Sequence, residues 1–158
     1  VGSRLQNRVR TVRGEAGRLR EILDDFLRYA GRMTLEPTPS DLNQLVEEVA
    51  DFFAPQATVS QVRLHVAPRQ GEVRAEVDVR LVKQALLNLM LNATQAMPQG
   101  GELIVRTGVE GDFACISVTD TGPGMSQDVA TKVFEAYYST KKGGTGLGLP
   151  LTRRIAEE

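Results

Sequence analysis

The run Asn88-Leu89-Met90-Leu91-Asn92-Ala93 is the first of four short patterns between Lys83 and Pro150 on which the interpretation of this chain depends. The other three, in chain order, are Asp120-Thr121-Gly122-Pro123-Gly124-Met125, then Val133-Phe134-Glu135 with Ser139-Thr140-Lys141, and finally Gly143-Gly144-Thr145-Gly146-Leu147-Gly148-Leu149. Each pattern alone has an ordinary explanation, because helix caps, Asp-Gly turns and glycine-rich loops are common. The signal becomes specific because all four occur in this order and spacing.

The bulk composition is that of a soluble globular protein. The 158 residues suit one domain, or one domain with an appendage, and 41% are hydrophobic while 25% are charged. A net charge of −1 creates no overall field that would attract nucleic acid or a membrane surface. The single cysteine, Cys115, cannot form an internal disulfide, which fits a reducing compartment. We therefore predict a cytoplasmic location, even if a longer parent protein is anchored in a membrane.

The first thirty residues carry a heptad repeat. Apolar residues are spaced alternately four and three apart at Leu5, Val9, Val12, Ala16, Leu19, Leu23, Phe26 and Ala30. This spacing is typical of a coiled coil or a four-helix bundle. Gly14 and Gly17 each weaken the helix by roughly 1 kcal/mol relative to alanine, so packing on a partner must support it. We predict a dimerisation helix over 1–33, with a surface helix packed on its own domain as the alternative.

The next segment contains a predicted break between domains. Pro37 and Pro39 end the helical pattern, so we predict a linker over 34–40 and a second domain over 41–158. Ser40 or Asp41 is placed to cap a helix whose apolar positions are Leu42, Leu45, Val46, Val49 and Phe53. Residues 62–66 and 73–77 alternate like strands, and the Gln70-Gly71 turn between them predicts a hairpin.

The remaining elements complete an α+β arrangement. Asp78 is placed to cap a helix that ends near Met97, and two strands follow over 103–105 and 114–118, joined around Gly111-Asp112. A last helix begins near Leu147. This order predicts a two-layer α/β sandwich, with a mostly antiparallel sheet and helices on one face.

The four patterns closely resemble the N, G1, F and G2 boxes of the ATP-binding domain of bacterial sensor histidine kinases. That family is a branch of the superfamily that includes gyrase, the heat-shock chaperone ATPases and MutL, and the variant looks like the nitrogen-regulation class. Residues 18–30 also resemble the end of the second helix in the histidine-kinase dimerisation hairpin. The resemblance implies the Bergerat ATP-binding fold, in which two further strands follow the last helix. We therefore expect the domain over 41–158 to lack those two C-terminal strands.

The two asparagines lie four residues apart and therefore share one face of the helix. An amide oxygen is a suitable ligand for Mg²⁺, and the resemblance implies that Asn92 holds the Mg²⁺ that bridges the ATP phosphates. At the position of Asn88, the gyrase-like ATPases carry a glutamate that activates water. An amide cannot accept that proton, so Asn88 favours phosphoryl transfer to a protein nucleophile over ATP hydrolysis. Two ordinary surface amides are the alternative for this pair.

The second pattern is suited to adenine recognition. A carboxylate at Asp120 can accept a hydrogen bond from the exocyclic amine of adenine, while Gly122 and Gly124 allow the backbone to pass close to the base. Met125 follows and is expected to pack on the adenine ring. The alternative is a plain Asp-Gly turn.

The last two patterns are suited to phosphate binding. Gly144, Gly146 and Gly148 precede or open a helix near Leu147, where free backbone N–H groups and the positive end of the helix dipole attract phosphate. A lid lies between the Val133-Phe134-Glu135 pattern and the start of this helix, and it contains Thr140, Lys141 and Thr145. Lys141 is the candidate for a contact with the γ-phosphate. The resemblance implies that Phe134 anchors this lid to the core.

The phosphoacceptor histidine expected of the family is missing from the sequence. The only histidine, His65, lies in a strand pattern without the acidic neighbour of the family's H box. The resemblance therefore implies a protein-histidine kinase domain that uses ATP and Mg²⁺, a histidine-bearing dimerisation helix outside these residues, a homodimer and a response-regulator receiver domain. The alternatives are an ATP-gated conformational ATPase, an anti-sigma-type serine kinase and a non-catalytic dimerisation module.

Overall fold

The computed structural model describes residues 2–141 and 143–158, so Val1 of the predicted segment 1–33 lies outside the described residues. The described helices are α1 (Gly2–Ala30), α2 (Leu42–Val59), α3 (Val79–Ala96), α4 (Gln127–Lys132) and α5 (Gly148–Glu157). The strands are β1 (Thr38–Asp41), β2 (Val62–Ala67), β3 (Arg74–Val77), β4 (Gly101–Glu110) and β5 (Phe113–Asp120). The helices predicted from Asp78 and near Leu147, and the hairpin around Gly111-Asp112, are all present.

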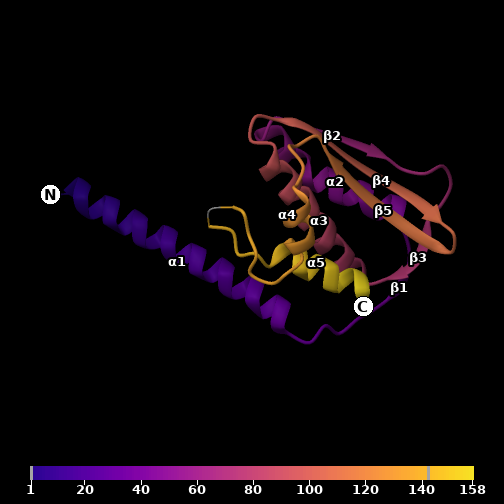
Figure 1. Ribbon diagram of the computed structural model, residues 1–158, viewed down its shortest axis with the longest axis horizontal. Helices are drawn as coiled ribbons and strands as arrows, with labels where there is room; N and C mark the ends of the chain where they lie inside the picture. Colours follow the sequence, from indigo (N-terminus) through magenta and orange to yellow (C-terminus); the bar gives the residue numbers. More distant parts are fainter. Residues whose placement is uncertain (1, 142) are drawn as a thin grey trace.

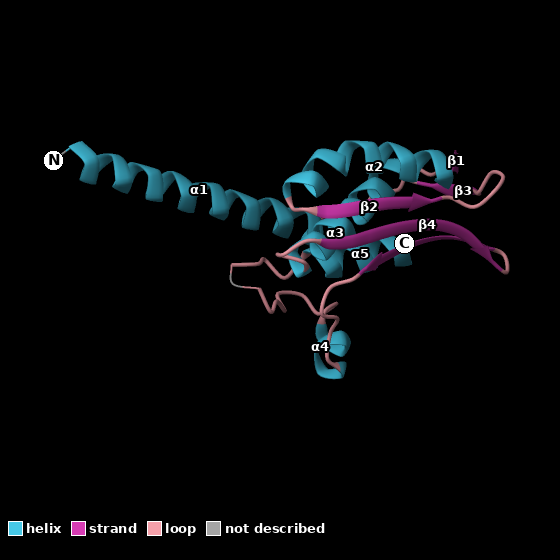
Figure 2. Cartoon of the chain, turned by 90° about the horizontal axis from the view of Figure 1, so that it is seen from above, coloured by secondary structure: helices cyan, strands magenta, loops and turns pink. Residues whose placement is uncertain are grey.

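Strands β2, β4 and β5 form one sheet, with β4 in the centre. Strand β2 runs parallel to β4, whereas β5 runs antiparallel to β4. Helices α2 and α3 pack against this sheet, and α5 packs on α3 (Figure 2). The predicted α+β two-layer sandwich is therefore confirmed.

The hairpin predicted from residues 62–66 and 73–77 is wrong. Strand β2 pairs with β4, and β3 pairs with β1 in a separate antiparallel ribbon. The reason is burial: Leu64 pairs with Leu103 and Val66 with Val105, so the apolar face of β2 continues that of β4. The linker predicted over 34–40 also overlaps β1, because Thr38 begins that strand. The division into domains stays a prediction.

The core lies between the sheet and helices α2 and α3. Its most deeply buried side chains are Met90 from α3, Val46 from α2, Leu103 and Val105 from β4, and Val73. Each such side chain contributes roughly 1.5–3 kcal/mol by leaving water. All five apolar positions predicted for the helix after the linker are buried, at Leu42, Leu45, Val46, Val49 and Phe53. The helical period of the sequence therefore identified the buried face of α2 correctly.

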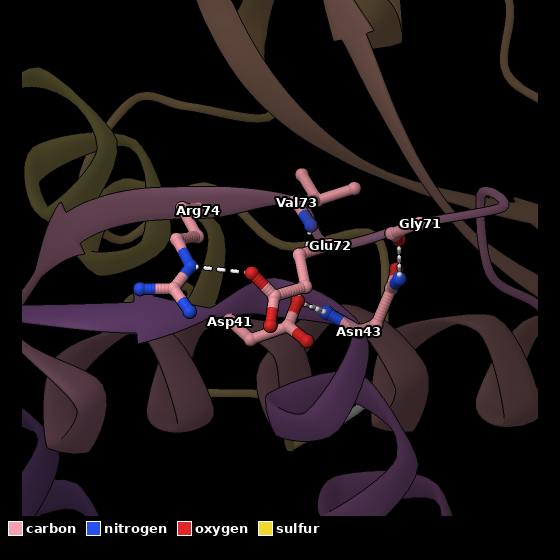
Figure 3. A network of polar contacts seen from close by, with 6 residues as sticks. All are labelled: Asp41, Asn43, Gly71, Glu72, Val73 and Arg74. Carbon is pink, nitrogen blue, oxygen red and sulfur yellow. Dashed lines mark hydrogen bonds and ion pairs between the residues drawn. The ribbon is translucent and has the colours of Figure 1, made fainter.

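A polar network joins the start of α2 to the segment before β3 (Figure 3). The carboxylate of Asp41 caps α2 by accepting from the backbone N–H of Asn43, at 3.0 Å, and also accepts from the backbone N–H of Val73, at 3.1 Å. The Asn43 side chain donates to the backbone carbonyls of Arg69 and Gly71, at 3.0 and 2.7 Å. These bonds, and not a β2–β3 ladder, hold the connection between β2 and β3 against the start of α2.

Asp78 fixes the start of α3, the helix that carries both asparagines. One carboxylate oxygen caps the helix by accepting from the backbone N–H of Leu81, and the other accepts from the backbone N–H of Glu36, both at 3.1 Å. The pKa of Asp78 is lowered, first by the Glu36 N–H, then by the Leu81 N–H and by the charge of Arg80, against an opposing effect of burial. Asp78 therefore ties the segment after α1 to α3.

Helix α1 reaches away from the rest of the fold (Figure 1). The predicted helix is present, and its apolar residues Leu5, Leu19 and Leu23 are 67%, 65% and 55% exposed. Its role in dimerisation stays a prediction. None of the helices in the described ranges has the length and apolar character needed to cross a membrane.

We predict that Asp78→Asn reduces stability at neutral pH and flattens its dependence on acid. The folded-state pKa of Asp78 lies below the ordinary value of about 3.9, so its contribution is complete above that value and is lost as the pH falls through the folded-state pKa. Urea unfolding at about pH 6 and about pH 3 measures this difference. Asp112→Asn, in the β4–β5 turn, is the control, and equal acid sensitivity of wild type and Asp78→Asn would contradict the prediction.

Candidate nucleotide-binding site

Three segments that hold predicted site residues lie against one side of α3. Positions 88, 92 and 96 are spaced about one helical turn apart, and each lies against a different segment. Asn88 contacts the start of α5, Asn92 contacts the lid, and Ala96 lies against the turn after β5. Helix α3 therefore brings together three segments that are separated in the sequence.

The lid contacts α3 through Lys141. Its ammonium Nζ donates to Asn92 Oδ1 at 2.9 Å and to Gln95 Oε1 at 2.7 Å. Although the residue as a whole is exposed, partial desolvation of the ammonium against α3 lowers the pKa of Lys141. The amide oxygen predicted to bind Mg²⁺ thus already accepts a cationic donor.

Asn88 connects α3 to the glycine-rich turn. Its Nδ2 lies 3.4 Å from the backbone carbonyl of Gly148 and 3.5 Å from Thr152 Oγ1, and both atoms accept from it. These are long hydrogen bonds, but they orient the amide toward the first turn of α5. Asn88 therefore has a positioning contact that the sequence pattern did not reveal.

The base of the lid is closed by a backbone contact between Tyr137 and Gly146. The N–H of Tyr137 donates to the carbonyl of Gly146 at 2.9 Å. Gly146 has a φ of +68°, and a Cβ at this position would lie 2.5 Å from the Tyr137 carbonyl carbon. Only glycine fits both the backbone conformation and the close approach. Leu147 follows and is buried, which fixes the start of α5.

The beginning of α5 has the features of a phosphate site. No side chain caps this ten-residue helix within the described residues, although the backbone N–H of Leu147 lies 3.4 Å from Thr145 Oγ1. Pro150 occupies the first turn, where its missing N–H removes no helical hydrogen bond. Backbone N–H groups of this turn therefore remain available to an anion.

The predicted adenine-binding residues lie at the exposed end of β5 and in the turn that follows it. Asp120 Oδ1 accepts from the backbone N–H of Gly122 at 2.8 Å, which is also the bond of an ordinary Asp-Gly turn. A Cβ on Gly122 would lie 2.7 Å from that carboxylate oxygen and 3.4 Å from Ala96 of α3, so a larger residue there would displace the Asp120 side chain. Gly124 has a φ of +72°, and Met125 is 62% exposed. The turn therefore lies beside α3 and presents its methionine to solvent.

The lid differs from the expectation at Phe134 and at Thr145. Phe134 is 43% exposed, so it does not anchor the lid in the core; the guanidinium of Arg153 instead lies 6.0 Å from its ring centroid. Thr140 is exposed, and Gly144 leaves no room for a Cβ beside Ser139 Oγ. Thr145 Oγ1 donates to Asp25 Oδ2 of α1, at 2.9 Å. The lid thus contacts α1 as well as α3.

Gln95 was missed by the sequence patterns. It lies three residues after Asn92, and this helical spacing could have identified it as a neighbour on the same face. Asp25 was also missed, because its contact with Thr145 joins residues 120 positions apart. A contact over that separation leaves no local signal in a single sequence.

The donor set fits the groups that the resemblance implies. Asn92 Oδ1 is a hard oxygen ligand that already accepts a hydrogen bond from the Lys141 ammonium. Mg²⁺ uses few protein ligands where phosphate and water complete its coordination shell. The start of α5 offers backbone donors and Lys141 offers an ammonium, both suited to phosphate. The arrangement is therefore chemically consistent with a magnesium–nucleotide complex.

Comparison with known proteins identifies the family. Residues 77–158 match the model described as histidine kinase-, DNA gyrase B- and HSP90-like ATPase. The sensor histidine kinase ZraS of Escherichia coli O157:H7 is 33% identical over 144 residues, which cover 91% of this chain and 31% of ZraS. Sporulation kinase B of Bacillus subtilis (strain 168) is 33% identical over 147 residues, covering 92% of this chain and 34% of that kinase. The chain spans about a third of the length of these relatives.

Solved structures show the same architecture. Full-length ShkA in complex with AMPPNP superposes with a TM-score of 0.84 at 26% identity, covering 96% of this chain and 33% of ShkA. The catalytic domain of the histidine kinase ThkA superposes with a TM-score of 0.71 at 30% identity, covering 77% of this chain and 80% of that domain. Together with the fold and the grouping of residues along α3, these matches show that the chain belongs to the histidine kinase-, DNA gyrase B- and HSP90-like ATPase family.

Proposed function

We propose that this chain is the ATP-binding kinase segment of a two-component sensor histidine kinase, of the nitrogen-regulation-like class. The observation that carries the proposal is the convergence on α3 of Asn92, Lys141 and the start of α5, with the Asp120 turn at the end of the same helix. Relatives named as sensor histidine kinases support the same function. The substrate is Mg²⁺–ATP, and the location is cytoplasmic.

Each group has a separate task in this proposal. Asp120 accepts the adenine amine, and the backbone N–H groups at the start of α5 bind the phosphates. Asn92 holds the Mg²⁺, which neutralises charge on the phosphate oxygens when bound. Lys141 binds the γ-phosphate. The glycines at 144, 146 and 148 shape the turn around the phosphates, and Met125 and Thr140 border the nucleotide.

The same geometry favours transfer over hydrolysis. Asn88 has no basic carboxylate, and its Nδ2 is directed at Gly148 and Thr152 on α5. It therefore positions the phosphate-binding turn and does not activate water. His65 is exposed on β2 and lies on none of the elements that form the site. The acceptor histidine is supplied by a dimerisation helix outside these residues, and a response-regulator aspartate receives the phosphoryl group next; ThkA has been solved with its response regulator TrrA.

We predict that Asp120→Ala abolishes selectivity for adenine and weakens ADP binding about ten- to a hundredfold, the effect of losing one hydrogen bond to a charged group. Isothermal titration calorimetry with ADP and with GDP, both in Mg²⁺, measures this loss. Asp128→Ala on α4 is the control, since that carboxylate is also exposed and lies on another element. Equal ADP affinity in wild type and Asp120→Ala would discard Asp120 as the adenine contact.

We predict that Asn92→Ala makes nucleotide binding insensitive to Mg²⁺. The variant loses the one protein oxygen proposed to bind the ion, so titrations of ADP in Mg²⁺ and in EDTA should give the same affinity. Wild type and Gln99→Ala, a change beyond the end of α3, should both bind more tightly in Mg²⁺. A persistent Mg²⁺ effect in Asn92→Ala would show that another group holds the ion.

We predict a concentration-dependent dimer formed through α1. Its seam residues Leu5, Leu19 and Leu23 are largely exposed in the single chain, and an exposed heptad seam is stabilised by a partner helix. Sedimentation velocity should show dimer at high protein concentration for wild type and for Arg20→Glu, which lies outside the seam. Leu19→Glu should sediment as a monomer. A wild-type monomer at every concentration would contradict the prediction.

A further inference from the structure

Lys141 is held by two neutral oxygens of α3. Its Nζ donates to Asn92 Oδ1 at 2.9 Å and to Gln95 Oε1 at 2.7 Å, and these two acceptors lie three residues apart on one helix face. Among the described residues, no ion pair includes Lys141. The ammonium thus has hydrogen-bond acceptors at this position but no compensating negative charge.

We propose that Lys141 and the divalent cation compete for Asn92 Oδ1, and that Gln95 is a positioning residue that retains the lid lysine beside the site. This inference rests on the proposed function, because it concerns the same nucleotide site. Before nucleotide binds, the ammonium takes the place of the metal ion on Asn92 and holds the lid against α3. When the metal arrives with the nucleotide, the lysine leaves Asn92.

The exchange follows from charge and geometry. An ammonium and a divalent cation on one amide oxygen would lie only a few ångströms apart, where their mutual repulsion disfavours joint occupancy. The metal is favoured once phosphate oxygens complete its coordination shell, whereas the ammonium gains only two neutral acceptors. The displaced ammonium then needs an anion, and the terminal phosphate supplies one. The Tyr137–Gly146 contact at the base of the lid holds the segment that carries Lys141 close to α3 throughout.

The exchange predicts that the Lys141 amine is more accessible with bound ADP than with a bound nucleotide triphosphate. Mg²⁺–ADP removes Lys141 from Asn92 but offers no γ-phosphate to receive it, so the amine becomes freer than in the nucleotide-free protein. Mg²⁺–AMPPNP supplies a γ-phosphate and protects the amine again. ADP in EDTA leaves Asn92 without a metal ion, so Lys141 keeps its contact. A lysine that simply closes over any bound nucleotide would be protected in all three cases.

The test is acetylation of Lys141 by N-hydroxysuccinimidyl acetate at one fixed pH, measured by mass spectrometry. The protein carries Lys142→Arg, so that acetylation measured at this point of the sequence comes from Lys141 alone. Lys132 on α4 is the internal reference. Relative to the nucleotide-free protein, Mg²⁺–ADP should raise the acetylation rate of Lys141 about tenfold, the effect of losing hydrogen bonds to a charged group. ADP in EDTA should leave that rate unchanged, and Mg²⁺–AMPPNP should return it to the low value.

Variants of Gln95 test the positioning role. Gln95→Leu should raise the acetylation rate of Lys141 in the nucleotide-free protein above that of wild type. Gln95→Glu should keep that rate at or below the wild-type value, because a carboxylate accepts from the ammonium more strongly. Gln84→Leu, earlier on α3, is the matched control and should change nothing.

Three outcomes overturn the exchange. One is a nucleotide-free Lys141 that reacts as fast as Lys132, another is a Lys141 acetylation rate that Mg²⁺–ADP lowers or leaves unchanged, and the third is a Gln95→Leu variant with unchanged reactivity. Calorimetry on the same samples separates the two proposals. If Mg²⁺–ADP binds and the reactivity of Lys141 stays constant, the exchange alone is refuted; if no nucleotide binds to the folded protein, the proposed function is refuted as well.

Discussion

The structure depends on the two-sided character of α3. One face buries Met90, Leu86 and Ala93 in the core, and the opposite face carries Asn88, Asn92 and Gln95. The helical period of 3.6 residues separates these two sets, so the same apolar packing that stabilises the fold also sets the direction of the polar side chains. Because Asp78 caps this helix and holds the preceding segment through Glu36, the start of α3 is fixed in place. The candidate site is thus built on a rigid element.

The lid is held in place by individual hydrogen bonds and not by burial of apolar side chains in the core. The lid is closed at its base by Tyr137 and Gly146, and it touches α3 through Lys141 and α1 through Thr145. Arg154 of α5 also donates to the backbone carbonyls of Tyr29 and Gly31 at the end of α1, which lack helical partners. The helix that carries the proposed phosphate site is therefore joined directly to the proposed dimerisation helix.

Sequence reasoning succeeded where local chemistry decides structure. The cap of α3 at Asp78, the apolar face of α2 and the β4–β5 hairpin were all predicted from patterns within a few residues, and Asp41 was one of the two residues offered as the cap of α2. It failed for the pairing of β2, because the alternation of Val62, Leu64 and Val66 identifies a half-buried strand without naming its neighbour. The partner was decided by burial against β4, which lies some forty residues further along the chain. The prediction that Phe134 anchors the lid to the core was wrong for a related reason. A single aromatic residue does not reveal whether the core has room for it.

The sequence by itself determined the family, the α+β class, and the set of residues from which a nucleotide site is proposed, because each of those signals is a local pattern of side chains and spacing. Only the tertiary structure decided that Lys141 meets Asn92 and Gln95, that Asn88 meets the first turn of α5, and that Thr145 meets Asp25. Those contacts join positions 46 to 120 residues apart. They exist because burial of the core face of α3 leaves its polar face open to the glycine-rich turn and the lid, and no local pattern carries that information.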